Sequence, residues 1–395
     1  MGSCEADVAD LHRIGYRGAG VRIGLLDTGV DGSHPALSGR IERFRYFEAG
    51  GFSFRDCDPI DSGWHGTHLA GLMVGGRSSD GFVGIAPDAH LFSGAVIEDG
   101  YILARILLGL DWLAECEPSV VNLAIGLPTA SPVLRTLVRA LTGRDILVVA
   151  PIGNRGAGAA CAPGIYPEVL SVGAADDSGG VAKFSGSANH PVSKACEKPD
   201  LVAPGVDIVS TLPGGAFGAR GGTSISSAIV AGMAALLREA FPQASADTIS
   251  HALRVTCAPV ASSQALRTRH GSVRLRAAFE YLERGCDTNP RCYPPAGCSP
   301  AFIDPRLSEK LAYAKTGERA DAILEFIDHD ALEAFERSFL AARSEHRPDQ
   351  DRFLKLRHVP ACIVRCPARL IRAALESPAL RVASACDVDR GTHLS

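Results

Sequence analysis

The chain has 395 residues, of which 46% are hydrophobic and 21% are charged. This balance predicts a folded protein with a sizeable core and excludes wholesale disorder. A total of 40 Lys and Arg residues against 44 Asp and Glu gives a net charge of −4, so we expect neither nucleic acid nor a membrane as a partner. No segment reaches the roughly 18 apolar residues of a membrane span. The start of the chain shows no signal peptide, which predicts a cytoplasmic location with mostly reduced thiols.

The first part of the chain alternates short apolar runs with segments of helical spacing. The patterns predict strands at 21–30, 119–126 and 145–154, and helices at 102–117 and 226–241. Short buried strands separated by helices indicate a mostly parallel sheet covered on both faces. The predicted fold class is therefore α/β with three layers. In such folds, polar residues at the carboxyl ends of strands are the usual place for chemistry.

The composition then changes and predicts a second unit. Residues 286–306 are rich in Pro and Cys and lack periodicity, which predicts a linker between a domain at 1–285 and another at 307–395. The second domain has the order β-α-β-β-α-β, the ferredoxin-like pattern of an α+β fold. Its strands are predicted at 321–327, 351–359, 361–366 and 379–388, and its helices at 330–345 and 368–377. The apolar face of its first helix is predicted to consist of Leu332, Phe335, Phe339 and Leu340.

Three short motifs contain residues suited to amide hydrolysis. Asp27 ends a predicted strand in LLDTGVDG, whereas His65 in WHGTHLAG and Ser224 in GGTSISSAIVAG stand at predicted helix starts. A serine hydroxyl needs a base to remove its proton, and a buried carboxylate orients that base and stabilises its cation. Ser224 at a helix N-terminus also directs backbone N–H groups toward a developing oxyanion. Asn154, at the end of another strand, supplies a side-chain amide that can donate to the same oxyanion.

These motifs, in this order, resemble those of the subtilisin-like serine proteases, or subtilases, from about Gly15 to Glu283. The resemblance implies that Asp27, His65 and Ser224 form a catalytic triad and that Asn154 is the oxyanion donor. It also implies two substrate-binding segments. The edge segment that pairs with the substrate backbone would be Leu123, Ala124, Ile125 and Gly126. The wall of the primary specificity pocket would be Ala150, Pro151, Ile152 and Gly153.

The chain departs from the family pattern in two places. Ile225 follows the serine where the family has Met, and Ala228 and Ile229 stand in a stretch where the family has Pro and His. These residues are small or apolar, so the helix is expected to be preserved. The loop 75–84 corresponds to a calcium-binding loop in many members, but Arg77 stands where a ligand would be expected. A cation there opposes Ca²⁺, so we predict no calcium at this loop, no metal among the site residues and no cofactor, while weak cation sites elsewhere stay open.

The C-terminal domain resembles a subtilase propeptide. In secreted members such a domain precedes the catalytic domain, assists its folding and inhibits it by placing its C-terminal tail in the cleft. In this chain the order would be reversed. The tail 390–395 is then expected to reach the active site, so that the C-terminal domain inhibits in cis.

The sequence thus predicts a serine endopeptidase with a peptide or protein substrate, held in check by its own C-terminal domain and suited to processing. Two alternatives stay open. A catalytically silent scaffold would bind peptides without turnover, and a regulatory protein would need a partner for activation.

Several polar and sulfur-containing residues have plainer interpretations. His68 lies three residues after His65 but is predicted to be a packing residue rather than a metal ligand. The five-residue gaps between Cys286, Cys292 and Cys298 differ from zinc-site spacing. A disulfide among them is an alternative to free thiols. The three cysteines of the C-terminal domain are predicted to be small core residues, although Cys362 or Cys366 could pair with Cys386.

Overall fold

The computed structural model describes residues 2–78, 81, 83–98, 100–188, 197–285, 302–314, 318–343, 351–386 and 393–394. Three predicted features fall partly or wholly outside this part of the chain. Residues 79, 80 and 82 of the loop predicted to lack calcium lie outside it. So do the three linker cysteines, and so do all tail residues after 386 other than His393 and Leu394.

The N-terminal unit, residues 2–285, is built on an eight-stranded sheet with the order β3-β2-β4-β1-β5-β7-β8-β9. All neighbouring strands are parallel except β3, which pairs antiparallel with β2 at one edge. The strands are β1 (Arg22–Asp27), β2 (Ile41–Phe47), β3 (Phe54–Asp56), β4 (His90–Ala95), β5 (Val120–Asn122), β7 (Leu147–Pro151), β8 (Leu170–Ala175) and β9 (Leu201–Pro204). Two shorter features beside this sheet are β6 (Ile125–Gly126) and a hairpin of β10 (Ile208–Leu212) and β11 (Ala216–Arg220).

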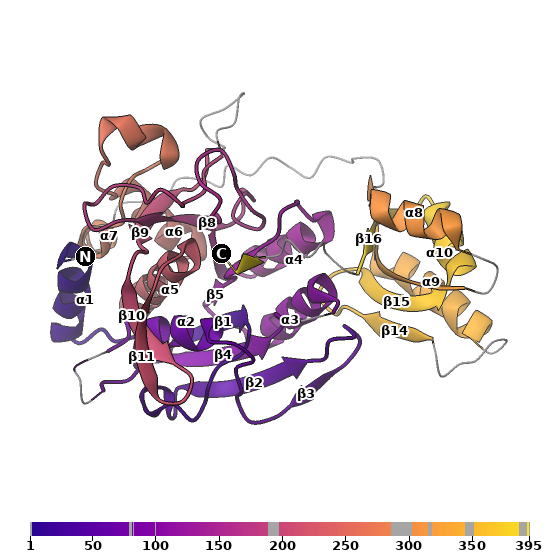
Figure 1. Ribbon diagram of the computed structural model, residues 1–395, viewed down its shortest axis with the longest axis horizontal. Coiled ribbons are helices and arrows are strands. Elements are labelled where there is room, and N and C mark those ends of the chain that lie inside the picture. The colour runs from indigo at the N-terminus through magenta and orange to yellow at the C-terminus, as the bar shows by residue number, and fades with distance from the viewer. Residues whose placement is uncertain are drawn as a thin grey trace.

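Helices cover both faces of this sheet, which confirms the predicted three-layer α/β class (Figure 1). The helices are α1 (Gly2–Arg13), α2 (His65–Val74), α3 (Ile102–Cys116), α4 (Pro132–Gly143), α5 (Thr223–Ala240), α6 (Ala246–Val255) and α7 (Leu275–Glu283). Side chains on a strand alternate between faces, so Ile23 and Leu25 of β1 pack with α2 and α5, whereas Leu26 packs with α3. Among the described residues, no helix combines the length and apolar character needed to cross a bilayer.

The C-terminal unit, residues 302–386, contains a five-stranded sheet with the order β12-β16-β13-β15-β14. Its four longer strands are antiparallel to their neighbours, and the short β12 is parallel to β16. The elements are β12 (Phe302–Ile303), α8 (Pro305–Tyr313), β13 (Arg319–Phe326), α9 (His329–Arg343), β14 (Arg352–Lys355), β15 (Ala361–Pro367), α10 (Ala368–Leu375) and β16 (Leu380–Ala385). From β13 to β16 they follow the predicted order of strand, helix, strand, strand, helix, strand.

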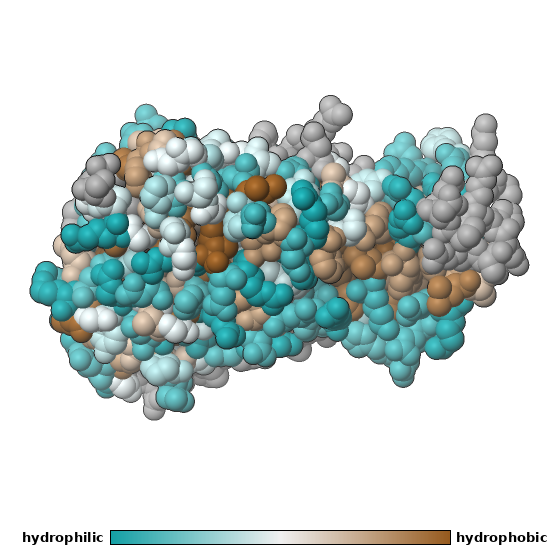
Figure 2. All heavy atoms as spheres, turned by 90° about the horizontal axis from the view of Figure 1, so that it is seen from below, coloured by the Kyte–Doolittle hydropathy of each residue, from teal (hydrophilic) through white to brown (hydrophobic). Residues whose placement is uncertain are grey.

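The two faces of the C-terminal sheet contact different partners. Leu324 and Val364 face α8, α9 and α10 and form a separate core with them. Ile323 and Ile363, one position along each strand, belong instead to the core that contains α3 and α4. Figure 1 shows the unit beside these two helices, and in Figure 2 apolar residues gather near the junction of the two units.

Two predictions for this unit need correction. Leu340 is 53% exposed, although it was predicted on the apolar face of α9 with Leu332 and Phe339, which are buried. Position 340 follows 339 by 100° around the helix, which carries its side chain off the buried stripe. The predicted linker also extends too far, because residues 302–303 form β12 and α8 begins at Pro305.

Candidate active site

Asp27 and His65 meet at the carboxyl end of the sheet. Asp27 is the last residue of β1, a central strand, and His65 is the first residue of α2. The Nδ1 atom of His65 lies 2.8 Å from Asp27 Oδ1 and 2.9 Å from Oδ2. The backbone N–H of Thr28 donates to the same carboxylate at 2.7 Å, and both acid and imidazole are buried. A carboxylate held in this way fixes the tautomer with the proton on Nδ1 and stabilises the imidazolium.

Ser224 lies on the other side of this imidazole. It is the second residue of α5, and its Oγ lies 2.8 Å from His65 Nε2. With the proton on Nδ1, Nε2 is free to accept the hydroxyl proton of Ser224. The first backbone N–H groups of a helix have no partner within it. The start of α5 therefore offers donors beside the hydroxyl, as the sequence predicted.

Asn154 is oriented by the residue before the serine. Its Oδ1 accepts hydrogen bonds from the backbone N–H of Thr223 at 2.9 Å and from the Thr223 hydroxyl at 3.0 Å. That hydroxyl also accepts from the N–H of Gly153 at 3.2 Å. Because the carbonyl end of the Asn154 amide is occupied by two donors, its NH₂ end is the one directed away from Thr223. Gly153 has φ +106°, a conformation that side-chain-bearing residues rarely adopt.

The two predicted substrate-binding segments lie at the carboxyl ends of β5 and β7, which are neighbours in the sheet. Leu123, Ala124, Ile125 and Gly126 follow β5, and Ala150, Pro151, Ile152 and Gly153 end β7 and follow it; all eight are buried. β6 lies in the first segment and pairs antiparallel with β17 (His393–Leu394), with His393 opposite Gly126 and Leu394 opposite Ile125. The C-terminal end of the chain thus lies against this segment (Figure 1). β17 runs toward Ala124 and the end of β5.

His68 is a packing residue, as predicted. Its Nε2 lies 3.1 Å from the carbonyl oxygen of Ile208 and 3.2 Å from that of Gly218, so it ties α2 to the hairpin of β10 and β11. Burial, the largest cause, lowers the pKa of His68 to about 4. The ring therefore stays neutral at physiological pH and donates from Nε2.

The residues that support Asp27, His65 and Asn154 carry no recognisable sequence signal. Thr223 gave no separate signal, although it stands next to the serine. Asp61 lies just before the motif of His65 and has no role in it by sequence, yet it accepts a hydrogen bond from Thr28 Oγ1 at 2.7 Å and another from the N–H of Thr67 at 2.9 Å. It thereby links the end of β1 to the start of α2. No local sequence signal marks such a long-range polar pair.

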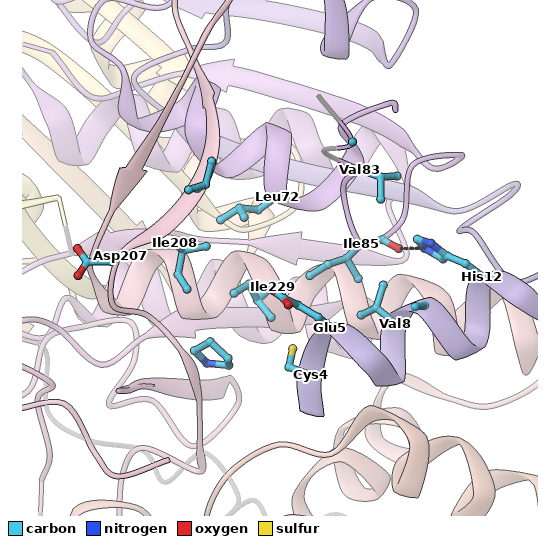
Figure 3. A pocket seen from close by; sticks show the side chains of 14 residues that line it. Cys4, Glu5, Val8, His12, Leu72, Val83, Ile85, Asp207, Ile208 and Ile229 are labelled. Atoms are coloured by element: carbon cyan, nitrogen blue, oxygen red, sulfur yellow. Dashed lines mark hydrogen bonds between the residues drawn. The ribbon is translucent and has the colours of Figure 1, made fainter. Parts of the chain in front are cut away.

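A cavity of about 480 Å³ lies away from this site, between α1, α2 and α5 (Figure 3). Its labelled lining is mostly apolar, with His12 bound to the carbonyl of Ile85 at 2.7 Å. None of the four predicted catalytic residues lines it. The candidate active site therefore rests on the polar constellation at the sheet edge and not on this cavity.

An Asp, His and Ser in this chain order, at the carboxyl edge of a parallel sheet, define a subtilisin-like α/β protein. The sequence profile of the subtilase family matches residues 18–275. The chain therefore belongs to the subtilase family, which confirms the resemblance seen in its motifs.

Individual proteins of known name are similar to this chain. Subtilisin E from Bacillus subtilis (strain 168) is 36% identical over 241 residues, which cover 59% of each chain. Subtilisin Savinase from Lederbergia lenta is 35% identical over 256 residues, or 64% of this chain and 88% of the relative. The chain thus spans less than two thirds of the length of subtilisin E. The structure of the prenylagaramide maturation protease PagA matches with a TM-score of 0.58 and 22% identity, covering 70% of this chain and 98% of PagA. That match shows the fold alone.

Proposed function

We propose that this chain is a serine endopeptidase. The observation that supports the proposal is the continuous hydrogen-bond path from Asp27 through His65 to Ser224, with 2.8 Å at each imidazole nitrogen. As Ser224 Oγ attacks the scissile carbonyl carbon, His65 Nε2 accepts its proton, and Asp27 stabilises the imidazolium. The NH₂ group of Asn154 and the N–H of Ser224 donate to the oxyanion. His65 then protonates the leaving amine, and water hydrolyses the acyl-enzyme by the same steps.

The substrate would bind as an added strand on β6. An edge strand recognises extended peptides through backbone hydrogen bonds, and β17 occupies β6 in this manner. PagA is named as a maturation protease, and we propose a similar role for this chain, namely limited cleavage of a peptide or protein precursor.

A fluorophosphonate probe tests the catalytic proposal. It should label the chain at Ser224 and fail to label Ser224→Ala. Ser178→Ala, at an exposed serine bonded to Asp176, is the matched control and should label like the wild type. The comparison should include chains that lack residues 390–395, because self-inhibition would block the probe. Equal labelling of the wild type and Ser224→Ala in both backgrounds would refute the proposal.

We further propose that the C-terminal unit inhibits the active site in cis. β17 lies on the edge segment that a substrate would need, and it runs toward Ala124 and the end of β5. The sheet of the C-terminal unit packs its Ile323 and Ile363 face into the core that contains α3 and α4. The C-terminal sheet, packed against α3 and α4, would hold β17 in place on β6.

Polar contacts accompany this apolar interface. Asp111 of α3 accepts hydrogen bonds from the backbone N–H groups of Arg357 and His358 at 2.9 Å each, and His358 Nδ1 lies 2.8 Å from it. Arg357 also forms an ion pair of 2.6 Å with Glu115. On α4, the Thr136 hydroxyl donates to Glu325 at 3.0 Å. These contacts fix the orientation of the C-terminal unit on the two helices.

Removal of residues 390–395 tests the inhibition. The shortened chain should hydrolyse a small peptide substrate faster than the full chain, because β6 becomes available. A synthetic peptide of residues 389–395, added to the shortened chain, should compete with the substrate, whereas the same residues in reversed order should not. A shortened chain that is folded and no faster would show that the tail does not block the cleft.

A further inference from the structure

A tryptophan and an arginine lie beside the imidazole of His65. The Trp64 ring is edge-on to the His65 ring with centroids 5.4 Å apart, and Trp64 is 36% exposed. The guanidinium carbon of Arg220, at the end of β11, lies 4.9 Å from the centroid of the Trp64 ring. Such a cation–π contact holds an otherwise mobile arginine in a defined position. The sequence pattern gave no indication of this pair.

The chemistry of the triad decides which half of a substrate passes this pair. His65 must deliver its proton to the leaving nitrogen, so the departing half of the substrate passes His65. The other half pairs with β6, and the oxyanion faces Asn154. Trp64 and Arg220 come from neither of those elements, since Trp64 directly precedes α2 and Arg220 lies four residues before Ser224. The pair therefore borders the leaving-group side.

The charge of Arg220 has no carboxylate partner among the described residues. Its Nη1 donates to the carbonyl of its neighbour Ala219 at 2.8 Å, and the side chain is half-buried. The carboxylate of Asp61, three residues before Trp64 in the chain, accepts hydrogen bonds from Thr28 and Thr67. A guanidinium presents five N–H donors in a fork that matches a carboxylate. Donors thus remain for an acidic ligand.

We propose that Arg220, held on Trp64, forms a subsite that selects an acidic side chain immediately after the scissile bond. This inference rests on the proposed endopeptidase function and adds a substrate preference to it. An Asp or Glu at that position would place its carboxylate against the guanidinium, whereas a Lys would be repelled. Arg220 acts on the substrate and not on the proton transfer, so the chemistry of the triad is unaffected.

Matched peptides test the preference. A peptide library first gives one cleaved sequence, and three versions are then made with Glu, Gln or Lys directly after the cleaved bond. The chain lacking residues 390–395 should cleave the Glu version with a kcat/KM about tenfold above the Lys version, as expected for one favourable charge contact. The ratio should shrink as salt rises. Arg220→Gln should reduce the ratio to about one, and Arg220→Glu should invert it.

A charge change elsewhere provides the control. Arg284→Glu alters the net charge equally at an exposed position at the end of α7 and should leave the ratio unchanged. Trp64→Ala should weaken the preference, and Trp64→Phe should retain it. Equal cleavage of all three peptides by the wild-type sequence would overturn the subsite while leaving the endopeptidase proposal standing. Failure to cleave any library member would overturn both.

Discussion

Substitution of Asp111 tests most directly whether the contact with α3 holds the C-terminal unit in its docked position. It belongs to the N-terminal unit, but its hydrogen-bond partners among the described residues, the N–H groups of residues 357 and 358 and the His358 ring, belong to the C-terminal unit. The carboxylate is buried, with only 6% of the residue exposed. Replacing Asp111 with Asn removes the charge and puts an NH₂ group opposite a donor. Docking should therefore weaken, while α3 loses no hydrogen bond of its own.

The size of this effect follows from the number of bonds. A hydrogen bond to a charged group contributes about 1.5–3 kcal/mol. Asn still has one accepting oxygen, so some of the hydrogen bonds survive. We expect the bonds that are lost to reduce the docking free energy by about 3 kcal/mol. Since 1.4 kcal/mol corresponds to a factor of ten, the undocked fraction should rise by about 100-fold. Basal hydrolysis should rise by the same factor until undocking no longer limits it.

The assay is the initial rate of hydrolysis of a short fluorogenic peptide by the full chain. His358→Ala removes the imidazole partner of Asp111 on the C-terminal unit. It should also raise the rate, although less, because the two N–H groups still donate to Asp111. Glu117→Gln is the control. Glu117 directly follows α3, and its ion-pair partner Arg144 directly follows α4, within the N-terminal unit. If Asp111→Asn and His358→Ala both remain folded by circular dichroism and hydrolyse at the wild-type rate, this contact does not hold the inhibited state.

Three further predictions concern single side chains. Thr223→Val should lower kcat by about 10- to 100-fold with KM unchanged, because the Asn154 amide loses an anchor, and Thr223→Ser should restore it. Burial raises the pKa of Glu325 above 4.5, so docking takes up a proton and weakens as pH rises through the raised pKa. Basal activity should therefore rise over that range in the wild type, and Glu325→Gln should abolish this rise. The Thr136 hydroxyl and the charge of Arg381 lower this pKa and so act against the effect of burial. The pKa of His68 is lowered to about 4, so urea unfolding should show about 3 kcal/mol of stability lost between pH 6.5 and pH 4. His68→Gln should show a smaller loss.

The parts of this molecule that could be predicted from sequence are those encoded in contiguous stretches. Asp27, His65 and Ser224 each stand where an apolar strand or helix meets a polar residue, so their places at element ends were readable. The residue types then restricted the chemistry. Asn154 was found in the same way, since it follows a buried strand. The family assignment rests on the same short motifs, which is why it needed no structure.

The parts that could not be predicted depend on long-range or very short features. Asp111 and His358 are 247 positions apart, and an aspartate within a mostly apolar helix gives no hint of its partner. β12 has two residues, which is too short for any periodicity. α1 was not predicted because its apolar residues, such as Leu11, are few and its helix lies near the start of the chain. Trp64 and Arg220 meet only when the hairpin of β10 and β11 folds over the start of α2.

The edge strand β6 connects the proposed activity with the proposed inhibition. An unpaired strand edge binds extended peptides, but it also invites unwanted pairing with other chains. Among the described residues, β17 is the strand that pairs with β6. Because β17 belongs to the same chain, its local concentration does not fall on dilution, and a competing peptide must displace it. The peptides that gain access would be those that also make contacts β17 does not make, and the leaving-group side at Arg220 is where such contacts are available.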